Sequence, residues 1–382
     1  MLTSFSIGQT VTVDHKALFV CFDIWMVIAS FLDIHQVVNM ALVGKNMRNI
    51  SVQTLKNRLS VVKMLRNYMP PTLYDPFREL QHYCDALISG SAVVQLLTEA
   101  NFGSIDLDIY VPQAKSRIFL EFMHAHFEYH STTKHGLQLD APDHGGPRPL
   151  HILARDDSDY WIATQSENVK CATASVATFA YGSRFIHVIS CLVAPMDTIL
   201  TFHSTVVMNI VSSTHIHCLY PKMTIVDKKA LITGQRSTNG DLCLVKYRAR
   251  GYTFFSSVNN STLRSCPVSP LSTKRRFVGD KHSFSFALPS KQELPKINNV
   301  YLSSWELWYQ RNTWNAHTSY CVFTAPRLSI PWICCDNKIL RLMRIALHRA
   351  MANNADDFQQ LDDDTAKAIQ ETFPTFFSHI EF

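Results

Sequence analysis

The sequence predicts a mixed α/β (α+β) protein with a helical segment in front, a mixed-sheet core and a C-terminal extension of a β-hairpin and helices. Three observations predict it: helical periodicity over residues 18–66, strand-like runs interleaved with helical ones over 77–255, and alternating aromatic residues over 299–323. Apolar residues make up 47% of the 382-residue chain, which is enough for a sizeable core.

The helical front is expected over residues 18–68. Ile24, Val27, Ile28 and Phe31 recur at spacings of three and four, and Asp33 can cap a second helix. A third helix is expected at about 52–65. Three prolines within 69–76 then indicate a domain boundary.

Behind this boundary we expect a core over 77–255 and a C-terminal extension over 277–382. The expected strands are 106–111, 150–154, 185–192 and 216–219, and the expected helices are 78–86, 92–99, 113–124 and 195–212. Residues 256–276 are rich in Ser, Pro and Asn and predict a long exposed loop that ends in the solvated run Lys274-Arg275-Arg276. Two further helices are expected at 338–351 and 356–372.

Charge and cysteine usage favour an intracellular protein, cytoplasmic or nuclear. The chain has 36 basic and 31 acidic residues, a net charge of +5, which permits contact with nucleic acid but does not require it. Its ten cysteines form no CxxC pair. The N-terminus lacks a basic signal-peptide region, and the apolar stretch 18–32 is too short to cross a bilayer, so no membrane partner is expected.

Two carboxylates stand out in the run from Ile105 to Val111. In a strand, alternation places Asp106 and Asp108 on one face and the apolar residues on the other. Their Cβ atoms are then about 6–7 Å apart, so both can reach one point. Two anions held together repel each other, and Mg²⁺ or Mn²⁺, which prefer carboxylate oxygens, would remove that cost.

A Gly-Ser pair precedes this strand. Gly90 permits close approach of a ligand, and Ser91 can cap the helical run 92–99. The free N–H groups of such a helix start suit the phosphates of a nucleotide. A phosphate cradle followed by a metal-holding strand is typical of phosphoryl transfer.

This combination resembles the nucleotidyltransferase superfamily, which has a polymerase-β-like fold. The pattern of an apolar residue, Gly-Ser, a helix and Asp-x-Asp in a strand is matched at Gly90, Ser91, Asp106 and Asp108. The stretches 88–112 and 185–254 further resemble a fungal family with this core. The resemblance implies the fold, an NTP partner and Asp106 and Asp108 as catalytic metal ligands.

The superfamily usually adds a third carboxylate from a later strand. On the expected strand 185–192 the position that faces the site is His187, which can ligate Mn²⁺ but is a poor Mg²⁺ ligand. Lys246 and Arg248, with Arg250, are candidates for triphosphate contacts, although a solvated helix face is the favoured explanation for these three residues.

The front segment resembles an F-box, a motif that docks on the Skp1 adaptor of a ubiquitin ligase. Its usual Leu-Pro opening is replaced by Cys21 and Phe22. The residues that fit are Ile24, Ile28, Ser30, Phe31, Leu32, Val37, Leu42, Val43, Lys45 and Arg48. A three-helix subdomain packed on the core explains the same pattern.

Two functions therefore stay open. The first is metal-dependent NTP binding or nucleotidyl transfer. The second is a non-catalytic F-box substrate adaptor of a ubiquitin ligase, in which the transferase-like domain is degenerate and recognises a target.

Overall fold

The computed structural model describes residues 22–134, 161–164, 173–233, 238–289, 300, 303–324 and 332–335. The expected strand 150–154 and the expected helices 338–351 and 356–372 lie outside these residues. The chain divides into two compact units, Met1–Ser60 and Val61–Phe382. The division falls before the proline-rich stretch, and the second unit contains both the expected core and the expected extension.

The described residues of the first unit, 22–60, form the helices α2 (Phe22–Ser30), α3 (Ile34–Met40) and α4 (Lys45–Arg58). The cap predicted at Asp33 is confirmed, because its Oδ1 accepts from Gln36 N at 2.8 Å and Gln36 Oε1 accepts from Asp33 N at 2.9 Å. A small core holds the helices together and consists of Ala29, Met40, Met47 and Ile50, with Trp25, Met26 and Leu32 packed against it.

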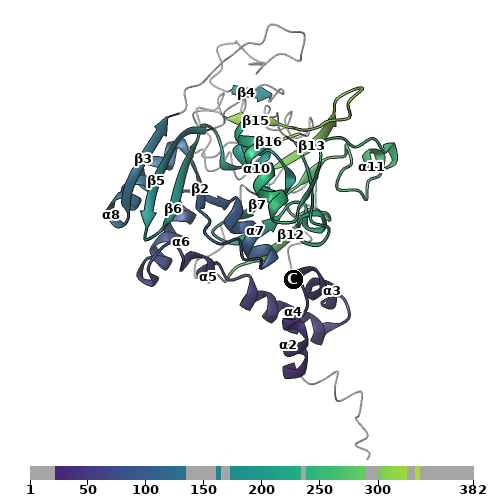
Figure 1. The fold of residues 1–382 in the computed structure, drawn as a ribbon, viewed down its shortest axis with the longest axis horizontal. Coiled ribbons are helices and arrows are strands. Elements are labelled where there is room, and N and C mark those ends of the chain that lie inside the picture. Colours follow the sequence, from purple (N-terminus) through teal and green to yellow (C-terminus); the bar gives the residue numbers. More distant parts are fainter. Residues whose placement is uncertain are drawn as a thin grey trace, which may run out of the picture. The chain divides into compact units, whose positions relative to one another are not determined.

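An eight-stranded sheet organises the second unit (Figure 1), in the order β12-β8-β7-β1-β2-β6-β5-β3. Within it, β2 and β6 are parallel and every other neighbouring pair is antiparallel. The strands are β1 (Leu87–Ser89), β2 (Leu107–Pro112), β3 (Glu128–Lys134), β5 (Thr173–Tyr181), β6 (Arg184–Cys191), β7 (Asn209–Val211), β8 (His215–Cys218) and β12 (Phe284–Ala287).

Helices pack against the centre of this sheet. Helix α7 (Ser91–Thr98) contacts β1, β2 and β7, and α8 (Gln113–His126) contacts β2 and β6. The other helices in the described part of this unit are α5 (Val61–Leu65), η1 (Pro71–Leu73), α6 (Tyr74–Tyr83), α9 (Pro195–Leu200), η2 (Thr205–Val207), η3 (Lys222–Val226), α10 (Thr238–Ala249) and α11 (Ser261–Ser265). No helix in the described part of the chain is long and apolar enough to cross a membrane.

The described residues of the second unit also form three small sheets: β9-β10 parallel, β11-β13-β14 and β4-β15-β16 antiparallel. The predicted aromatic hairpin is formed by β13 and β14. The strands are β4 (Trp161–Thr164), β9 (Lys229–Leu231), β10 (Thr253–Phe255), β11 (Arg276–Phe277), β13 (Ser304–Tyr309), β14 (Ala316–Ser319), β15 (Cys321–Thr324) and β16 (Trp332–Cys334). The chain is thus a mixed α+β protein, as predicted.

Three local predictions are wrong. The helix expected at about 52–65 is interrupted, because α4 ends at Arg58 and α5 begins at Val61. The helix expected over 195–212 ends at Leu200, and the chain continues as η2 and β7, which pairs with β1 and β8. The stretch 256–276 is not a wholly exposed loop, since it contains α11 and buries Leu271 and Ser272. Arg276, expected in a solvated run, is only 1% exposed.

Candidate metal and nucleotide site

The two carboxylates lie where the alternation placed them. Ile105, Leu107 and Ile109 are at most 3% exposed, whereas Asp106 and Asp108, on the other face, keep part of their surface exposed. In the sheet register Asp108 stands beside Ser89 of β1 and His187 of β6. The site therefore lies on one face of the sheet, across its parallel pair of strands.

Gly90 brings the turn before α7 directly against this site. Its φ of +78° belongs to the region that favours glycine, and a Cβ at this position would collide with Asp108 Oδ2. The Asp108 carboxylate is thus in van der Waals contact with the backbone at the start of α7. The closeness of turn and carboxylate is the geometry that the Gly-Ser pattern predicts.

Ser91 differs from the expectation in one respect. The residue that caps α7 is Gly90, without a side-chain hydrogen bond, and Ser91 is the first residue inside the helix. The Ser91 hydroxyl lies 2.9 Å from Tyr247 OH and accepts from Arg250 Nη1 at 3.2 Å. The hydroxyl is therefore part of a contact between α7 and α10, and the polar groups of this turn that a phosphate could meet are backbone N–H groups.

The environments of the two carboxylates differ. Burial raises the pKa of Asp108 to about 6, while the nearby His187 ring lowers the pKa of Asp106, whose side chain is 45% exposed. No described residue donates a hydrogen bond to the Asp108 carboxylate. Asp108 as a whole keeps some exposure, but its ionised carboxylate is poorly solvated and lacks a hydrogen-bond donor. A bound cation would offset the free-energy cost of this buried charge.

His187 is oriented toward Asp106. Its Nε2 lies 3.7 Å from Asp106 Oδ2, too long for a hydrogen bond but close enough for an ion pair. Its Nδ1 lies 3.0 Å from Thr178 Oγ1, on the neighbouring strand β5. A second hydrogen bond of this kind fixes the ring, as it does for imidazoles that bind metals. The pKa of His187 is raised because its protonated form is attracted by Asp106.

Of the candidate cations, the structure brings Lys246 to the site, since its charge acts on both Asp106 and Asp108. Arg248 lies elsewhere, with its guanidinium 5.6 Å from the centre of the Phe254 ring. Arg250 contacts Ser91 and stacks on Phe102, 4.2 Å from the ring centre. Lys246 is therefore the side chain of this group best placed to meet a phosphate beside the carboxylates.

Two neighbours of the site were missed by sequence reasoning. Thr178 positions the His187 ring, and the charge of Arg184 acts on Asp106. Arg184 Nη1 also lies 3.5 Å from the carbonyl of Ile105. Both residues reach the site by strand pairing across distant parts of the sequence, and no local pattern marks either of them.

The side chains at this site decide whether a divalent cation would fit it. Among the described residues, no three His, Cys, Asp or Glu side chains form a ready-made metal cage. Mg²⁺ and Mn²⁺ in phosphoryl-transfer sites are commonly held by one or two carboxylates, with phosphate oxygens and water completing the shell. Asp106 and the donor-free Asp108 fit that arrangement, and His187 Nε2 is a further donor that suits Mn²⁺.

Comparisons with protein-family models, with curated proteins and with solved structures find no match for this chain.

Proposed function

We propose that the second unit binds a nucleoside triphosphate together with Mg²⁺ or Mn²⁺. The observation that carries this proposal is the Asp108 carboxylate, which lies against Gly90 at the start of α7, beside Asp106, without a hydrogen-bond donor. Asp106 and Asp108 would hold the cation, with His187 as a third donor. When bound, the cation supplies positive charge at the phosphates.

Different groups of the protein would bind the phosphates and balance their charge. The backbone N–H groups after Gly90 would donate to the phosphates from the start of α7, where the helix dipole also favours an anion. Lys246 adds a positive charge within reach of the same carboxylates. The Tyr247–Ser91 contact joins α10 to α7 and so keeps Lys246, one residue before Tyr247, near the turn.

Nucleotidyl transfer from NTP to a hydroxyl is the reaction that the resemblance implies for such a site. It also requires removal of a proton from the acceptor, a task usually given to a carboxylate or to the metal. The position on β6 beside Asp108 is His187, which is paired with Asp106. We therefore propose metal-dependent NTP binding as the function of the site and test transfer separately.

Asp106→Asn and Asp108→Asn are expected to abolish binding of the metal–nucleotide pair. In the wild type, Mn²⁺ with a non-hydrolysable NTP should raise the midpoint of thermal unfolding, since a ligand at about 100 times its Kd stabilises by about 2.7 kcal/mol. Neither ligand alone should do so to the same extent, because the phosphates complete the metal shell. Differential scanning fluorimetry measures the shift.

Asp227→Asn, which removes a surface carboxylate, is the matched control and should respond as the wild type does. A wild type that shows no shift with Mn²⁺ and NTP together would contradict the proposal. If binding is found, incubation with labelled NTP tests transfer, which the Asp106→Asn variant should lack.

A second function is favoured by the surface of the first unit, and we propose that this unit docks on a Skp1-type adaptor protein. Phe31 is 84% exposed, Leu42 is 75% exposed and Val43 is 74% exposed. These large apolar side chains therefore lie on the surface of the unit, and other residues form its core. Phe22, Ile24, Val27 and Ile28 are also exposed. Exposed apolar side chains in this number are typical of a protein-binding surface.

Phe31→Ala is expected to weaken binding to purified Skp1 about thirtyfold, because loss of an apolar anchor at an interface costs about 2 kcal/mol. Leu42→Ala should act in the same direction. Leu32 is a poor choice for this test, since it packs on the core of the unit. Surface plasmon resonance with the full-length chain measures the affinity.

Leu242→Ala is a matched control, because Leu242 is a 65% exposed leucine on α10 of the second unit. It should leave the affinity for Skp1 unchanged. Failure of the full-length wild type to bind Skp1 would rule out the docking function.

A further inference from the structure

The strands β6, β5 and β3 lie side by side at one edge of the large sheet (Figure 1). One face of β5 and β6 is covered, since the ring of Phe179 lies 5.1 Å from that of His124 on α8 and the side chains on this face are buried: Ala177, Phe179, Ile186 and Val188. On the opposite face lie Thr178, Ala180, Phe185 and His187, none of which is buried. Because His187 stands beside Asp108 in the register, this open face continues the face that carries the two carboxylates.

Two aromatic rings stand on the open face. Phe185 is 38% exposed, and the ring centre of the exposed His130 lies 5.3 Å from its own, with the ring planes inclined by 45°. In the register of β3 against β5, Tyr129 pairs with Phe179 and Ser131 with Thr178, which leaves His130 as the extra residue of a bulge. A bulge re-aims a side chain, and here the His130 ring reaches Phe185 on the open face.

The two rings lie next to the carboxylates. Phe185 comes one position before Ile186, which pairs with Leu107, so Phe185 stands beside Asp106 on the neighbouring strand, about 5 Å away between backbones. In the sheet order, β1, which leads into the turn before α7, lies on one side of β2, and β6 lies on the other. A molecule that contacts Phe185 therefore approaches the carboxylates from the side away from the α7 turn.

The surroundings of the two rings indicate which kind of ligand they suit. Their neighbours on the open face, Thr178, Ala180 and Ser131, are polar or small rather than large and apolar. The apolar core that is typical of a protein interface is thus not present around them. Nucleobases fit such a surface better, because each base has a flat ring that stacks on an aromatic side chain and a polar edge that stays hydrated. Sheets with exposed aromatic residues bind single-stranded nucleic acid in this way.

We propose that Phe185 and His130 form a stacking platform for the bases of single-stranded nucleic acid. The bases of a duplex are stacked on one another, so their faces are not available to the platform. If the carboxylates bind NTP, the platform holds an acceptor strand on the side from which a hydroxyl reaches the phosphates in line. This acceptor role rests on the function proposed above, whereas the stacking itself does not.

Fluorescence anisotropy with the full-length chain tests the platform in EDTA, without metal or NTP. Labelled single strands of RNA and of DNA should bind, and the corresponding duplexes should bind at least about tenfold more weakly. A single strand of abasic nucleotides, which keeps the phosphates but has no bases, should also bind at least about tenfold more weakly. Since the abasic strand carries the same charge, this contrast separates stacking from attraction of the phosphates.

Phe185→Leu, which removes the ring but keeps an apolar side chain, should weaken binding of the single strand about tenfold. Phe185→Trp, which keeps a ring, should retain the affinity, and His130→Ala should act in the same direction as Phe185→Leu. Tyr181→Leu is the matched control, because Tyr181 is 37% exposed but its ring lies 6.4 Å from that of Phe127, and alternation places it on the covered face of β5. This variant should bind as the wild type does. Circular dichroism confirms that the variants are folded.

The stacking platform is overturned if the wild type does not bind single strands, or if it binds the abasic strand or the duplex equally well. Equal affinities of the wild type, Phe185→Leu and His130→Ala would overturn it too. Single-strand binding without stabilisation by Mn²⁺ and NTP would support the platform and contradict only the metal-dependent function. Stabilisation by Mn²⁺ and NTP without single-strand binding would contradict the platform alone.

Discussion

Arg276→Met is expected to lower the free energy of unfolding by about 3–5 kcal/mol, the cost of removing one partner from a buried ion pair. Arg276 and Asp280 have side chains only 2% and 6% exposed, with Nε and Oδ2 2.5 Å apart. The variant would leave the Asp280 carboxylate buried without its cation. Urea denaturation followed by fluorescence measures the loss.

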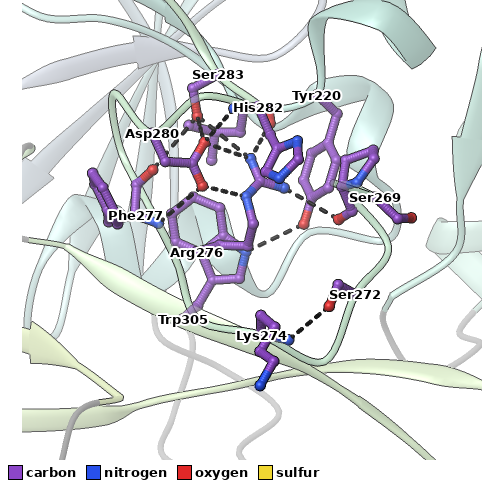
Figure 2. A network of polar contacts seen from close by, with 12 residues as sticks. Tyr220, Ser269, Ser272, Lys274, Arg276, Phe277, Asp280, His282, Ser283 and Trp305 are labelled. Carbon is purple, nitrogen blue, oxygen red and sulfur yellow. Dashed lines mark hydrogen bonds and ion pairs between the residues drawn. The ribbon is translucent and has the colours of Figure 1, made fainter. Parts of the chain in front are cut away.

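The Arg276 guanidinium makes further contacts besides its ion pair with Asp280. It lies 4.8 Å from the Tyr220 ring centre and 5.3 Å from that of Trp305 (Figure 2), and Nη2 donates to the carbonyl of Leu219 at 2.7 Å. Arg276→Lys should therefore also destabilise, since an ammonium keeps the charge but not the planar fork or the stacking.

Two further variants separate charge from packing. Arg276→Met/Asp280→Asn removes both charges and should recover part of the lost stability, because no buried charge is left without a partner. Arg275→Met, on the partly exposed neighbour, should cost less than about 1 kcal/mol. A loss below about 1 kcal/mol for Arg276→Met would show that the ion pair is not buried in solution.

The burial of Arg276 could not be predicted from the sequence. Three successive basic residues after a Ser- and Pro-rich stretch are typical of a solvated loop, and Lys274 is indeed exposed. The partners that bury Arg276 come from distant elements, such as Tyr220 after β8 and Trp305 of β13. No residue within a few positions of Arg276 indicates that these aromatic partners will contact it.

Local patterns predicted local structure well. Alternation placed Asp108 of β2 and Asp106, which directly precedes β2, on the same face, the turn at the Gly-Ser pair lies beside Asp108, and the Asp33 cap formed. Pairings across the sequence were not predictable in this way. The bond between Arg250 and Ser91 joins residues 159 positions apart, and η2 and β7 are set by β1 and β8 rather than by helical spacing in 195–212.

Asp197→Asn is expected to stabilise the protein at neutral pH by up to about 3 kcal/mol. Asp197 of α9 is 3% exposed, and burial raises its pKa from 3.8 to about 6, which makes ionising it cost up to about 3 kcal/mol more in the folded protein than in the unfolded chain. Tyr320 OH donates to Asp197 Oδ1 at 2.9 Å, but this bond only partly offsets the burial. An asparagine keeps an oxygen that can accept the same bond and carries no charge.

The sign of the pH dependence follows from the raised pKa. The protonated carboxyl is favoured in the folded state, so the contribution of Asp197 to stability is fully present below the unfolded-state pKa of 3.8 and is lost as pH rises through about 6. The advantage of Asp197→Asn over the wild type should therefore be small near pH 4 and largest above pH 6. Urea denaturation of both proteins from pH 4 to pH 8 measures the difference.

Asp227→Asn controls for the loss of one negative charge, since Asp227 is exposed. Other groups that titrate in this range, Asp108 among them, are shared by the wild type and the variant and cancel in the comparison. A difference that stays constant between pH 4 and pH 8 would mean that Asp197 ionises in the folded protein as easily as in the unfolded chain. A difference that grows with pH would instead identify Asp197 as a buried carboxyl that weakens the fold at neutral pH.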